Sequence, residues 1–304
     1  MSRRAYGYML IAAFEFSIVH LLLMNAASSA EPVLSPHLRE KVLSRLGLTR
    51  EPELALSGLQ KFYAAWCAQV PFDNVRKLIH VRAQVNGPLP SYTPEDFFEG
   101  FLKYGTGGTC WAGAGAMHAL LNNLGFDTER GIATMLHAPT ATPNHGTVLV
   151  KFGGLKYLVD SSMLFAEPLL LDENHTTGVN HPSWGVRICQ KDGRWHIAWR
   201  PLHKTDGFEC RIDRFAVTWT EFQSMHEATR GWSPFNFEVS ARRNRGNEVV
   251  GVGFGNAVRL RKDGGVDRSP APHQERCRIL IEEVGIGEEI VAQLPDDVPT
   301  PRPS

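Results

Sequence analysis

The sequence lacks an excess of charge of either sign, which argues against one broad class of partner. Lysine plus arginine equals aspartate plus glutamate at 32 residues each, in a chain of 304. Proteins that bind the phosphates of nucleic acid or an anionic lipid surface ordinarily present a positive field. Hydrophobic residues at 43% and charged residues at 21% are typical of a soluble globular protein. We therefore expect small-molecule partners rather than nucleic acid or a membrane.

Cysteines are few and widely spaced, which argues against two kinds of cross-linked fold. There are five, an odd number, and the closest pair, Cys189 and Cys210, lies 21 residues apart. Without a CxxC pair the pattern fits neither a disulfide framework nor a zinc ribbon, and we expect no metal site. Internal repeats and low-complexity tracts are lacking too. The length allows one large domain or two to three smaller ones.

The N-terminal segment leaves two interpretations open. Two arginines precede an apolar run over residues 8–24, and small residues follow it, as in a secretory signal peptide. Against this, Glu15 and His20 interrupt the run, and charge is costly in the lipid interior. A spurious or non-targeting extension, with translation starting at Met24, explains the same residues. Because the thiols fit a reducing compartment, we expect a cytoplasmic protein, with export or membrane anchoring through residues 1–30 as the alternative.

The first third of the chain is predicted to be helical. Ser35-Pro36 and Thr93-Pro94 each combine an N-cap residue with proline at the first helical position. Apolar spacing of helical period marks two more helices, one starting at Ser57 and one over residues 111–124. These four segments indicate a helical region before about residue 125.

The middle third changes to short alternating runs separated by turn residues, which predicts strands. Residues 148–160 form one expected hairpin about Gly153-Gly154, and residues 186–199 form another about Asp192-Gly193. A β-barrel or sandwich is therefore expected. Beyond about residue 215 we expect a smaller mixed region that ends in a late helix.

Cys110 lies between a glycine-rich turn and the fourth predicted helix. A thiol has an ordinary pKa of about 8.5, which a helix N-terminus or an imidazolium lowers to roughly 3.5 to 7.5. The preceding Gly107-Gly108 lets the backbone turn sharply and exposes amides that would stabilise an oxyanion. Alternatively, Cys110 is a small buried residue at the start of a helix. The cysteine alone leaves the choice open.

The first hairpin supplies a base and a carboxylate for such a nucleophile. If Gly153-Gly154 is a two-residue loop, opposed positions sum to 307, so Thr147 faces Asp160. His145 and Asp160 then share one sheet face as diagonal neighbours, about 7 to 8 Å apart, which their side chains can bridge. One more loop residue would shift this register, and a surface histidine with a polar strand end is the simpler alternative. His118 and His137 lack a comparable carboxylate, and we interpret both as structural.

Several segments together resemble the arylamine N-acetyltransferases. The resemblance runs from about Ser35 to Ile290 in the right order. The matching segments are VPFDNVRKL (70–78), GGTCW (107–111), LLNNLGF (120–126), NHGTVLVKFGGLKYLVD (144–160) and, more weakly, WSPFNF (232–237) and the late helix that ends in VGI (284–286).

The resemblance implies an α+β fold: an N-terminal helical bundle, a central antiparallel β-barrel and a C-terminal α/β lid around a core similar to that of cysteine proteases. On this basis residues 35–125 form the bundle with the nucleophile, 126–215 the barrel with the histidine and aspartate, and 216–304 the lid. Residues 1–34 are the signal-like or spurious extension.

The resemblance also implies a reaction. Cys110 is expected to accept the acyl group, His145 to act as base and Asp160 to orient it. The family takes an acetyl group from acetyl-CoA, a cosubstrate, and passes it to an aromatic amine, a hydrazine or an N-hydroxyarylamine by a ping-pong route. No tightly bound cofactor is implied. An amide synthase, a transglutaminase-like hydrolase with the same triad, and a non-catalytic ligand-binding homologue remain alternatives.

Two departures from the family pattern stand near the nucleophile. The family's arginine, glutamate and asparagine are here Thr106, Ala112 and Ala114, so a cation and an anion are missing together. We hypothesise that small residues replace a buried ion pair, which can leave stability intact. After the aspartate, the family's valine-glycine-phenylalanine-glycine is residues 161–164, Ser-Ser-Met-Leu, which alters the wall near the substrate pockets.

Two further motifs carry little weight. GVGFG at residues 251–255 resembles a dinucleotide loop, but an alternating, strand-like run follows it instead of a helix. A basic cluster is interpreted as a solvated face, with binding of the CoA phosphates as the alternative. It comprises Arg242, Arg243, Arg245, Arg259, Arg261 and Lys262.

Overall fold

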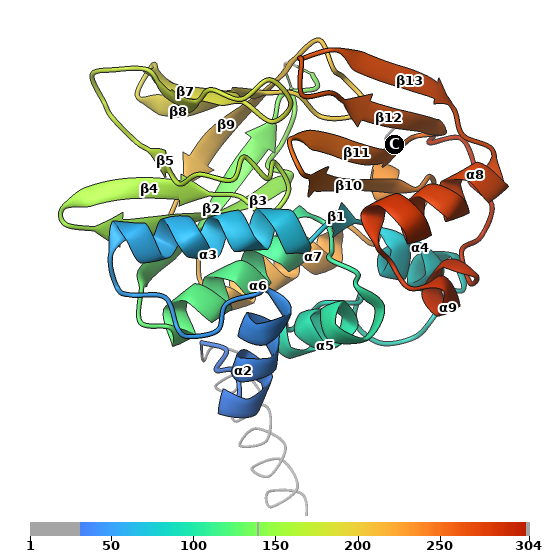
Figure 1. The fold of residues 1–304 in the computed structure, drawn as a ribbon, viewed down its shortest axis with the longest axis horizontal. Coiled ribbons are helices and arrows are strands. Elements are labelled where there is room, and N and C mark those ends of the chain that lie inside the picture. The colour runs from blue at the N-terminus through green and yellow to red at the C-terminus, as the bar shows by residue number, and fades with distance from the viewer. Residues whose placement is uncertain (1–30, 139, 302–304) are drawn as a thin grey trace, which may run out of the picture.

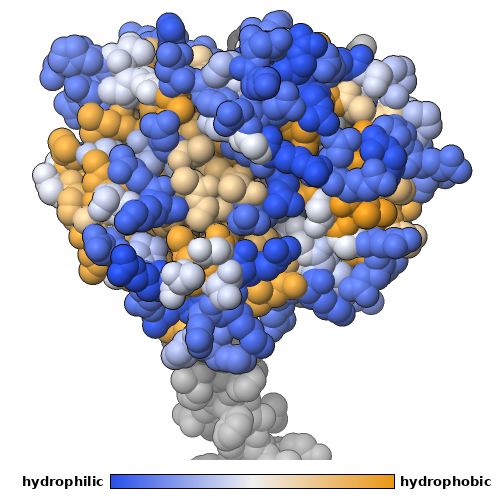
Figure 2. Space-filling model, viewed as in Figure 1, coloured by the Kyte–Doolittle hydropathy of each residue, from blue (hydrophilic) through white to orange (hydrophobic). Residues whose placement is uncertain are grey.

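The computed structural model describes residues 31–138 and 140–301. The signal-like run therefore lies outside the described residues. Figure 1 shows a helical layer beneath two antiparallel sheets that lie side by side. Polar side chains cover most of the face seen in Figure 2, and apolar ones form patches broken by polar ones.

From residue 31 to about residue 125, the described chain contains the four predicted helices and one more. Ser35 and Thr93 accept hydrogen bonds from the backbone N–H groups of Leu38 and Asp96, so both predicted N-caps are confirmed. The fifth helix, α4, was not predicted: Val75, Leu78 and Ile79 have helical spacing, but the helix has only eight residues, so the pattern covers little more than two turns. The helices are α2 (Pro36–Arg45), α3 (Leu56–Gln69), α4 (Val75–Arg82), α5 (Pro94–Tyr104) and α6 (Cys110–Asn123).

The middle of the chain forms an eight-stranded antiparallel sheet that nearly closes into a barrel. Its order is β5-β4-β3-β2-β9-β8-β7-β6. The hydroxyl of Thr177 on β6 donates to the carbonyl of Leu170 on β5 and so joins the two edges. The strands are β2 (Asp127–Met135), β3 (His145–Phe152), β4 (Leu155–Val159), β5 (Leu169–Leu170), β6 (Thr177–Val179), β7 (Val186–Lys191), β8 (Arg194–Trp199) and β9 (Phe208–Arg214).

The register of the first hairpin is the predicted one. Val148 lies opposite Val159 and Leu149 opposite Leu158, so paired positions sum to 307. Gly153 and Gly154 both have positive φ angles, 57° and 78°, as a two-residue loop of type I′ requires. The second hairpin, β7–β8, turns at Asp192-Gly193 as expected. Register thus follows from turn chemistry here.

The C-terminal region forms a second, five-stranded antiparallel sheet of order β1-β10-β11-β12-β13. Its first strand, β1, comes from the helical region of the chain and pairs with β10. GVGFG forms the end of β11 and the turn to β12, so it opens no helix. The strands are β1 (Phe72–Asp73), β10 (Ser240–Arg245), β11 (Glu248–Gly253), β12 (Asn256–Leu260) and β13 (Val266–Pro270).

Short helices complete this region and include the predicted late helix. A π-helical segment, η2, continues α8 and ends at Gly285, which has φ 85°. An α+β fold is therefore confirmed. The elements are α7 (Trp219–Ala228), η1 (Pro234–Asn236), α8 (His273–Arg278), η2 (Ile279–Val284) and α9 (Glu288–Val291).

The helix α6 lies at the centre of the main core. All of its residues from Cys110 to Leu121 are buried. It packs on the inner strands β2 and β3 of the barrel and against α5 and α7 (Figure 1). Because α6 has no solvated face, its amphipathic signal is weak. None of the helices in the described part of the chain is long and apolar enough to cross a membrane.

Candidate active site

Cys110 is the first residue of α6 and is 6% exposed. Its sulfur lies 3.7 Å from the carbonyl oxygen of Asn144, to which the thiol can donate. Among the described residues, the N-cap Thr109 makes no side-chain hydrogen bond to the first turn of the helix. The partial positive charge of this helix end therefore acts on the sulfur without a competing capping oxygen.

His145 and Asp160 form a buried pair at the open end of the first hairpin. The Nε2 atom of His145 lies 2.7 Å from Oδ2 of Asp160, and the two side chains are 2% and 0% exposed. The Cys110 thiol is close enough to His145 to contribute to raising the pKa of its imidazole. Since Nε2 faces the carboxylate, Nδ1 is the ring nitrogen left for the sulfur. The structure brings the three residues predicted for the site together.

The backbone of the following turn fixes the carboxylate of Asp160. Its Oδ1 atom accepts hydrogen bonds from the N–H groups of Ser162 and Met163, both at 2.8 Å. The hydroxyl of Tyr63 donates to the Asp160 carbonyl at 2.8 Å. Sequence reasoning missed Tyr63, which is 97 residues away in the chain. Both oxygens of the carboxylate are thus satisfied, and the imidazole has one orientation to adopt.

Burial and charge act in opposite directions on this pair. Burial alone would lower the pKa of His145, but the Asp160 carboxylate and the Cys110 thiol raise it to about 10. Burial raises the pKa of Asp160, and this is outweighed by the charge and hydrogen bond of His145, so that it lies below its ordinary value. At neutral pH the pair is an imidazolium and a carboxylate. An imidazolium next to a cysteine favours the nucleophilic thiolate.

One expectation about the nucleophile turn needs correction. The amide of Gly107 was expected to be available to an oxyanion, but it donates to Oδ2 of Asp73 at 2.6 Å. A side chain at position 107 would place Cβ 1.8 Å from the carbonyl oxygen of Pro71, so only glycine fits there. The Gly107 amide is therefore not free to stabilise an oxyanion.

Comparisons with known proteins identify the family of the chain. The sequence profile of the N-acetyltransferase family matches residues 55–206, which is half of the chain. An arylamine N-acetyltransferase of Mycolicibacterium smegmatis is 30% identical over 194 residues, covering 58% of this chain and 68% of that protein. The chain belongs to the arylamine N-acetyltransferase family. It is thus an acyltransferase by membership.

Solved structures of arylamine N-acetyltransferases share its fold. The enzyme from Mycobacterium abscessus superposes with a TM-score of 0.71 at 16% identity, over 86% of this chain and 98% of that one. The Mycobacterium marinum enzyme, solved in complex with CoA, gives a TM-score of 0.68 at 17% identity, over 84% and 93%. At these identities the likeness establishes the fold and leaves the substrates open.

The family departures near the nucleophile lie in a tightly packed region. Thr106 is fully buried, and its hydroxyl has no hydrogen-bond partner among the residues that the structure describes. Ala114 is also fully buried. At Gly113 an added Cβ would lie 2.6 Å from Oγ of Ser161, the residue after Asp160. The alanine-glycine run therefore lets α6 approach the turn that carries the aspartate.

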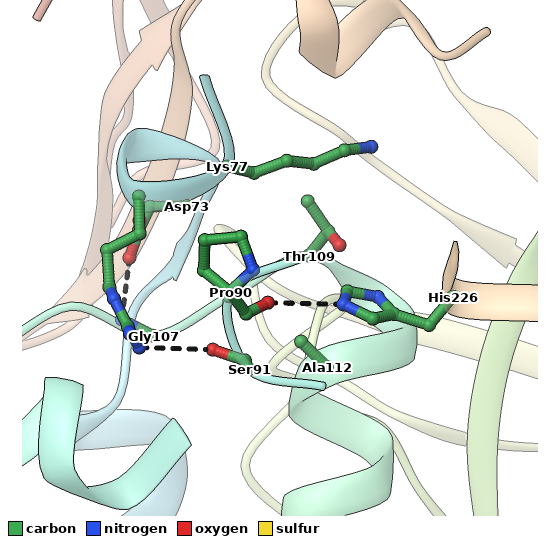
Figure 3. Close-up of a pocket in the computed structure, with 10 residues that line it drawn as sticks. Asp73, Lys77, Pro90, Ser91, Gly107, Thr109, Ala112 and His226 are labelled. Carbon is green, nitrogen blue, oxygen red and sulfur yellow. Dashed lines mark hydrogen bonds between the residues drawn. The ribbon is translucent and has the colours of Figure 1, made fainter. Parts of the chain in front are cut away.

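Ala112 lines a small cavity beside the nucleophile turn, drawn in Figure 3. Its volume of about 10 Å³ is that of a single water molecule. Lys77 of α4 extends along it and is 5% exposed; its ammonium donates to Oγ1 of Thr229 at 2.8 Å. Burial lowers the pKa of Lys77 to about 7. Sequence reasoning missed this buried amine, which is only partly charged at neutral pH.

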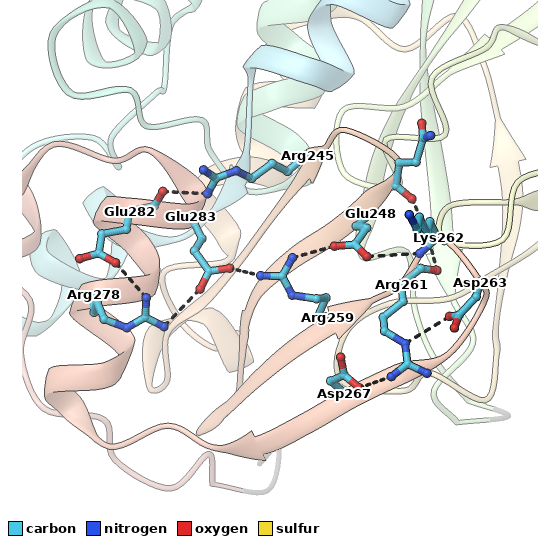
Figure 4. Close-up of polar contacts among 12 residues, drawn as sticks. Arg245, Glu248, Arg259, Arg261, Lys262, Asp263, Asp267, Arg278, Glu282 and Glu283 are labelled. Carbon is cyan, nitrogen blue, oxygen red and sulfur yellow. Dashed lines mark hydrogen bonds and ion pairs between the residues drawn. The ribbon is translucent and has the colours of Figure 1, made fainter.

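The remaining histidines and the basic cluster have other surroundings. His118 is buried, and burial with the charge of Arg130 lowers its pKa to about 4, whereas the ring of His137 is held by the Met135 carbonyl. Arg242 is only 4% exposed and lies over the ring of Trp199, so its assignment to a solvated face was wrong. In the C-terminal region, cations and carboxylates of the five-stranded sheet and of α8 and η2 form the ion pairs of Figure 4, which include Arg259, Arg261 and Arg278.

Proposed function

We propose that the protein transfers an acetyl group from acetyl-CoA to an aromatic amine, a hydrazine or an N-hydroxyarylamine. Family membership supports the reaction class, and the M. marinum relative that holds CoA supports the donor. The buried His145–Asp160 pair, whose imidazole is also influenced by the Cys110 thiol, is the observation that carries the mechanism. A buried imidazolium between a thiol and a carboxylate is an arrangement suited to nucleophilic acyl transfer.

The proposed first half-reaction forms an acetyl-cysteine. The Cys110 thiolate attacks the thioester carbonyl, the bond from carbon to the CoA sulfur breaks, and the proton on His145 passes to the departing CoA thiolate. Backbone amides at the start of α6 are placed to stabilise the negative oxygen of the tetrahedral intermediate. The products of this step are free CoA and a neutral acetylated enzyme with a neutral imidazole.

The second half-reaction releases the product and restores the enzyme. The acceptor nitrogen attacks the acetyl carbonyl, neutral His145 takes the proton that this nitrogen loses, and the bond to the Cys110 sulfur breaks. The products are an amide or hydrazide (an ester if the oxygen of an N-hydroxyarylamine attacks) and the thiolate–imidazolium pair. Asp160 keeps its charge throughout and orients the ring.

Intact-mass spectrometry tests the proposed function. Incubation with acetyl-CoA alone should add the mass of one acetyl group, and an arylamine should remove it much faster than water does. Cys110→Ala should remain unmodified, whereas Cys67→Ala, which removes another buried thiol, should behave as the native protein. Rapid CoA release without an amine would favour a hydrolase. Binding of acetyl-CoA without acetylation would favour a non-catalytic homologue.

We also propose a cytoplasmic location and a three-part organisation. The five thiols are free in the structure, and the cytoplasm supplies both reducing conditions and acetyl-CoA. N-terminal sequencing of the native protein checks the location, because a start near Glu31 in an exported fraction would contradict it. Limited proteolysis checks the division into residues 35–125, 126–215 and 216–304, with cuts expected near the two boundaries.

A further inference from the structure

The strand β1 links the nucleophile turn to the C-terminal sheet. Phe72 forms a parallel bridge with Gly108 on one side and pairs with Arg242 of β10 on the other. The next residue but one, Asn74, binds three backbone groups of the segment 235–240 through its side chain. The backbone of β1 is therefore held on both sides, and Asp73 between these residues has a fixed position.

The carboxylate of Asp73 holds the turn through a direct hydrogen bond. It is 1% exposed, and its Oδ2 accepts from the Gly107 N–H at 2.6 Å while Oδ1 accepts from the Val75 N–H at 3.0 Å. The Asp73 N–H donates to the Gly108 carbonyl at 3.3 Å. Two hydrogen bonds thus connect this one residue to the glycine pair that precedes Cys110.

No cation in the described part of the chain forms an ion pair with Asp73. The nearby guanidinium of Arg76 instead pairs with Asp96 and approaches the Ser91 hydroxyl. A buried carboxylate without an ion-pair partner is costly to keep ionised. We therefore expect the ionised carboxylate of Asp73 to have a role that a neutral hydrogen-bond acceptor would fill less well.

We propose that Asp73 is a positioning residue for acyl transfer: its carboxylate holds Gly107 and thereby fixes the turn that presents Cys110 to His145. The inference rests on the proposed function for its place in a reaction. A displacement of the nucleophile by about 1 Å costs roughly 100-fold in rate. A charge-assisted hydrogen bond to a turn amide is stronger than a neutral one and so restricts such displacement.

The protonation of Asp73 provides a second test of the proposal, through the pH dependence that it predicts. Burial raises its pKa to about 6, against the opposing effect of the Gly107 and Val75 amides and the charge of Arg76. The folded chain thus binds this proton more tightly than the unfolded chain, whose carboxyl has a pKa of 3.8. Above pH 6 the ionised Asp73 carboxylate lowers the free energy of unfolding. This destabilisation decreases as the pH falls below 6 and is absent below about pH 4. The titratable groups around the cavity and β1 are Arg76, Lys77, Asp96, His226 and Arg242.

The test compares Asp73→Asn with Asp96→Asn, a matched control. Asp96 also accepts a hydrogen bond from a backbone N–H, that of Ser91, and it lies in the same region without contacting the nucleophile turn. The readouts are the rate of Cys110 alkylation by iodoacetamide from pH 5 to 8, kcat and KM for acetyl-CoA, and the thermal midpoint. Asp73→Glu tests rescue, and Asp73→Ser replaces Asp73→Asn if the latter does not fold.

We expect Asp73→Asn to slow alkylation and kcat about 10-fold or more at pH 7.5, with KM within about 2-fold. The native alkylation rate should show an inflection near pH 6 that the variant lacks. The thermal midpoint of Asp73→Asn at pH 8 should stay close to that of the native protein, because removal of the buried charge offsets the loss of one of the two backbone hydrogen bonds. Asp96→Asn should keep the native alkylation rate at pH 7.5, while its inflection moves to lower pH because Arg76 is released from its ion pair near Asp73. Asp73→Glu should recover most of the rate.

The proposal would be overturned if Cys110 in Asp73→Asn were alkylated at the native rate. It would also be overturned if the slower alkylation came with a comparable loss of thermal stability, because the variant would then be generally destabilised. Alkylation needs no acetyl-CoA. If the native protein transfers no acetyl group, the proposed function fails, while the alkylation comparison still decides the role of Asp73.

Discussion

Charged side chains are handled differently in two regions of this molecule. Around Cys110 they are buried, and His145, Asp160, Asp73 and Lys77 are each at most 5% exposed. In the C-terminal region the arginines of the ion pairs in Figure 4 keep about 40% of their surface in water. Buried charges interact strongly and shift one another's pKa values, whereas water screens exposed pairs. Substitutions in the first region should therefore change activity, and those in the second should change little.

The largest effect is expected at Asp160. In Asp160→Asn the side chain can still accept from the backbone N–H groups of Ser162 and Met163, but it no longer stabilises the imidazolium of His145. We expect kcat for acetyl transfer to fall by up to about 10⁴-fold. Steady-state kinetics with an arylamine measure this loss, and far-UV circular dichroism controls for folding. A fall in kcat of less than about 10-fold would mean that the buried His145–Asp160 pair has a structural role instead of a catalytic one.

The next largest effect is expected at Gly107. In Gly107→Ala the added Cβ would lie 1.8 Å from the Pro71 carbonyl oxygen, so the backbone of the turn must move. We expect kcat to drop about 10- to 100-fold and stability to fall by about 1 to 3 kcal/mol. Gly231→Ala is the matched control, because its Cβ would meet only an ordinary contact at 3.6 Å. If the two variants had the same kcat and the same stability, the claim that close packing at Gly107 fixes the nucleophile turn would be contradicted.

A third prediction concerns the pH dependence of stability. The pKa of His145 is raised from 6.5 to about 10 in the folded chain. Its stabilising contribution is therefore complete below pH 6.5 and is lost as the pH rises through 10. Urea unfolding should show a steeper loss of stability between pH 6.5 and 10 for the native protein than for His145→Gln. Parallel curves would show that the imidazole is not held as a cation.

The smallest effect is expected among the C-terminal ion pairs. Arg259 pairs with Glu248 at 2.7 Å and Glu283 at 2.5 Å, yet its side chain is 38% exposed. Arg259→Ala should lower the free energy of unfolding by about 1 kcal/mol or less, and the difference should shrink in high salt. Acetyl transfer should stay within about 2-fold of native. A large loss of activity would remove the distinction between the two regions.

The same contrast explains how far the sequence predicts the structure. Local signals fix the hairpin: Gly153-Gly154 sets the register, and the register places His145 and Asp160 on one face. N-caps and proline locate α2 and α5 in the same way. These features depend on residues that are near one another in the chain.

What the sequence did not reveal depends on contacts over long distances. Tyr63 reaches Asp160 across 97 residues, and Lys77 reaches Thr229 across 152. Nothing local marks Arg242 as buried, because it becomes so only when Trp199 of the other sheet covers it. The helix α4 was missed for a related reason, since tertiary packing buries three of its residues despite their mixed pattern.

The central claim, that Cys110 carries the acetyl group, is tested most directly by locating the modification. The protein is incubated with acetyl-CoA, quenched in acid, digested and analysed by tandem mass spectrometry. Cys189 and Cys277 are more accessible than the buried Cys110, so reaction by exposure alone would favour them. Activation by His145 and Asp160 predicts a thioester on Cys110 at close to one per chain. An acetyl group on Cys189 or Cys277 with Cys110 unmodified would contradict the account.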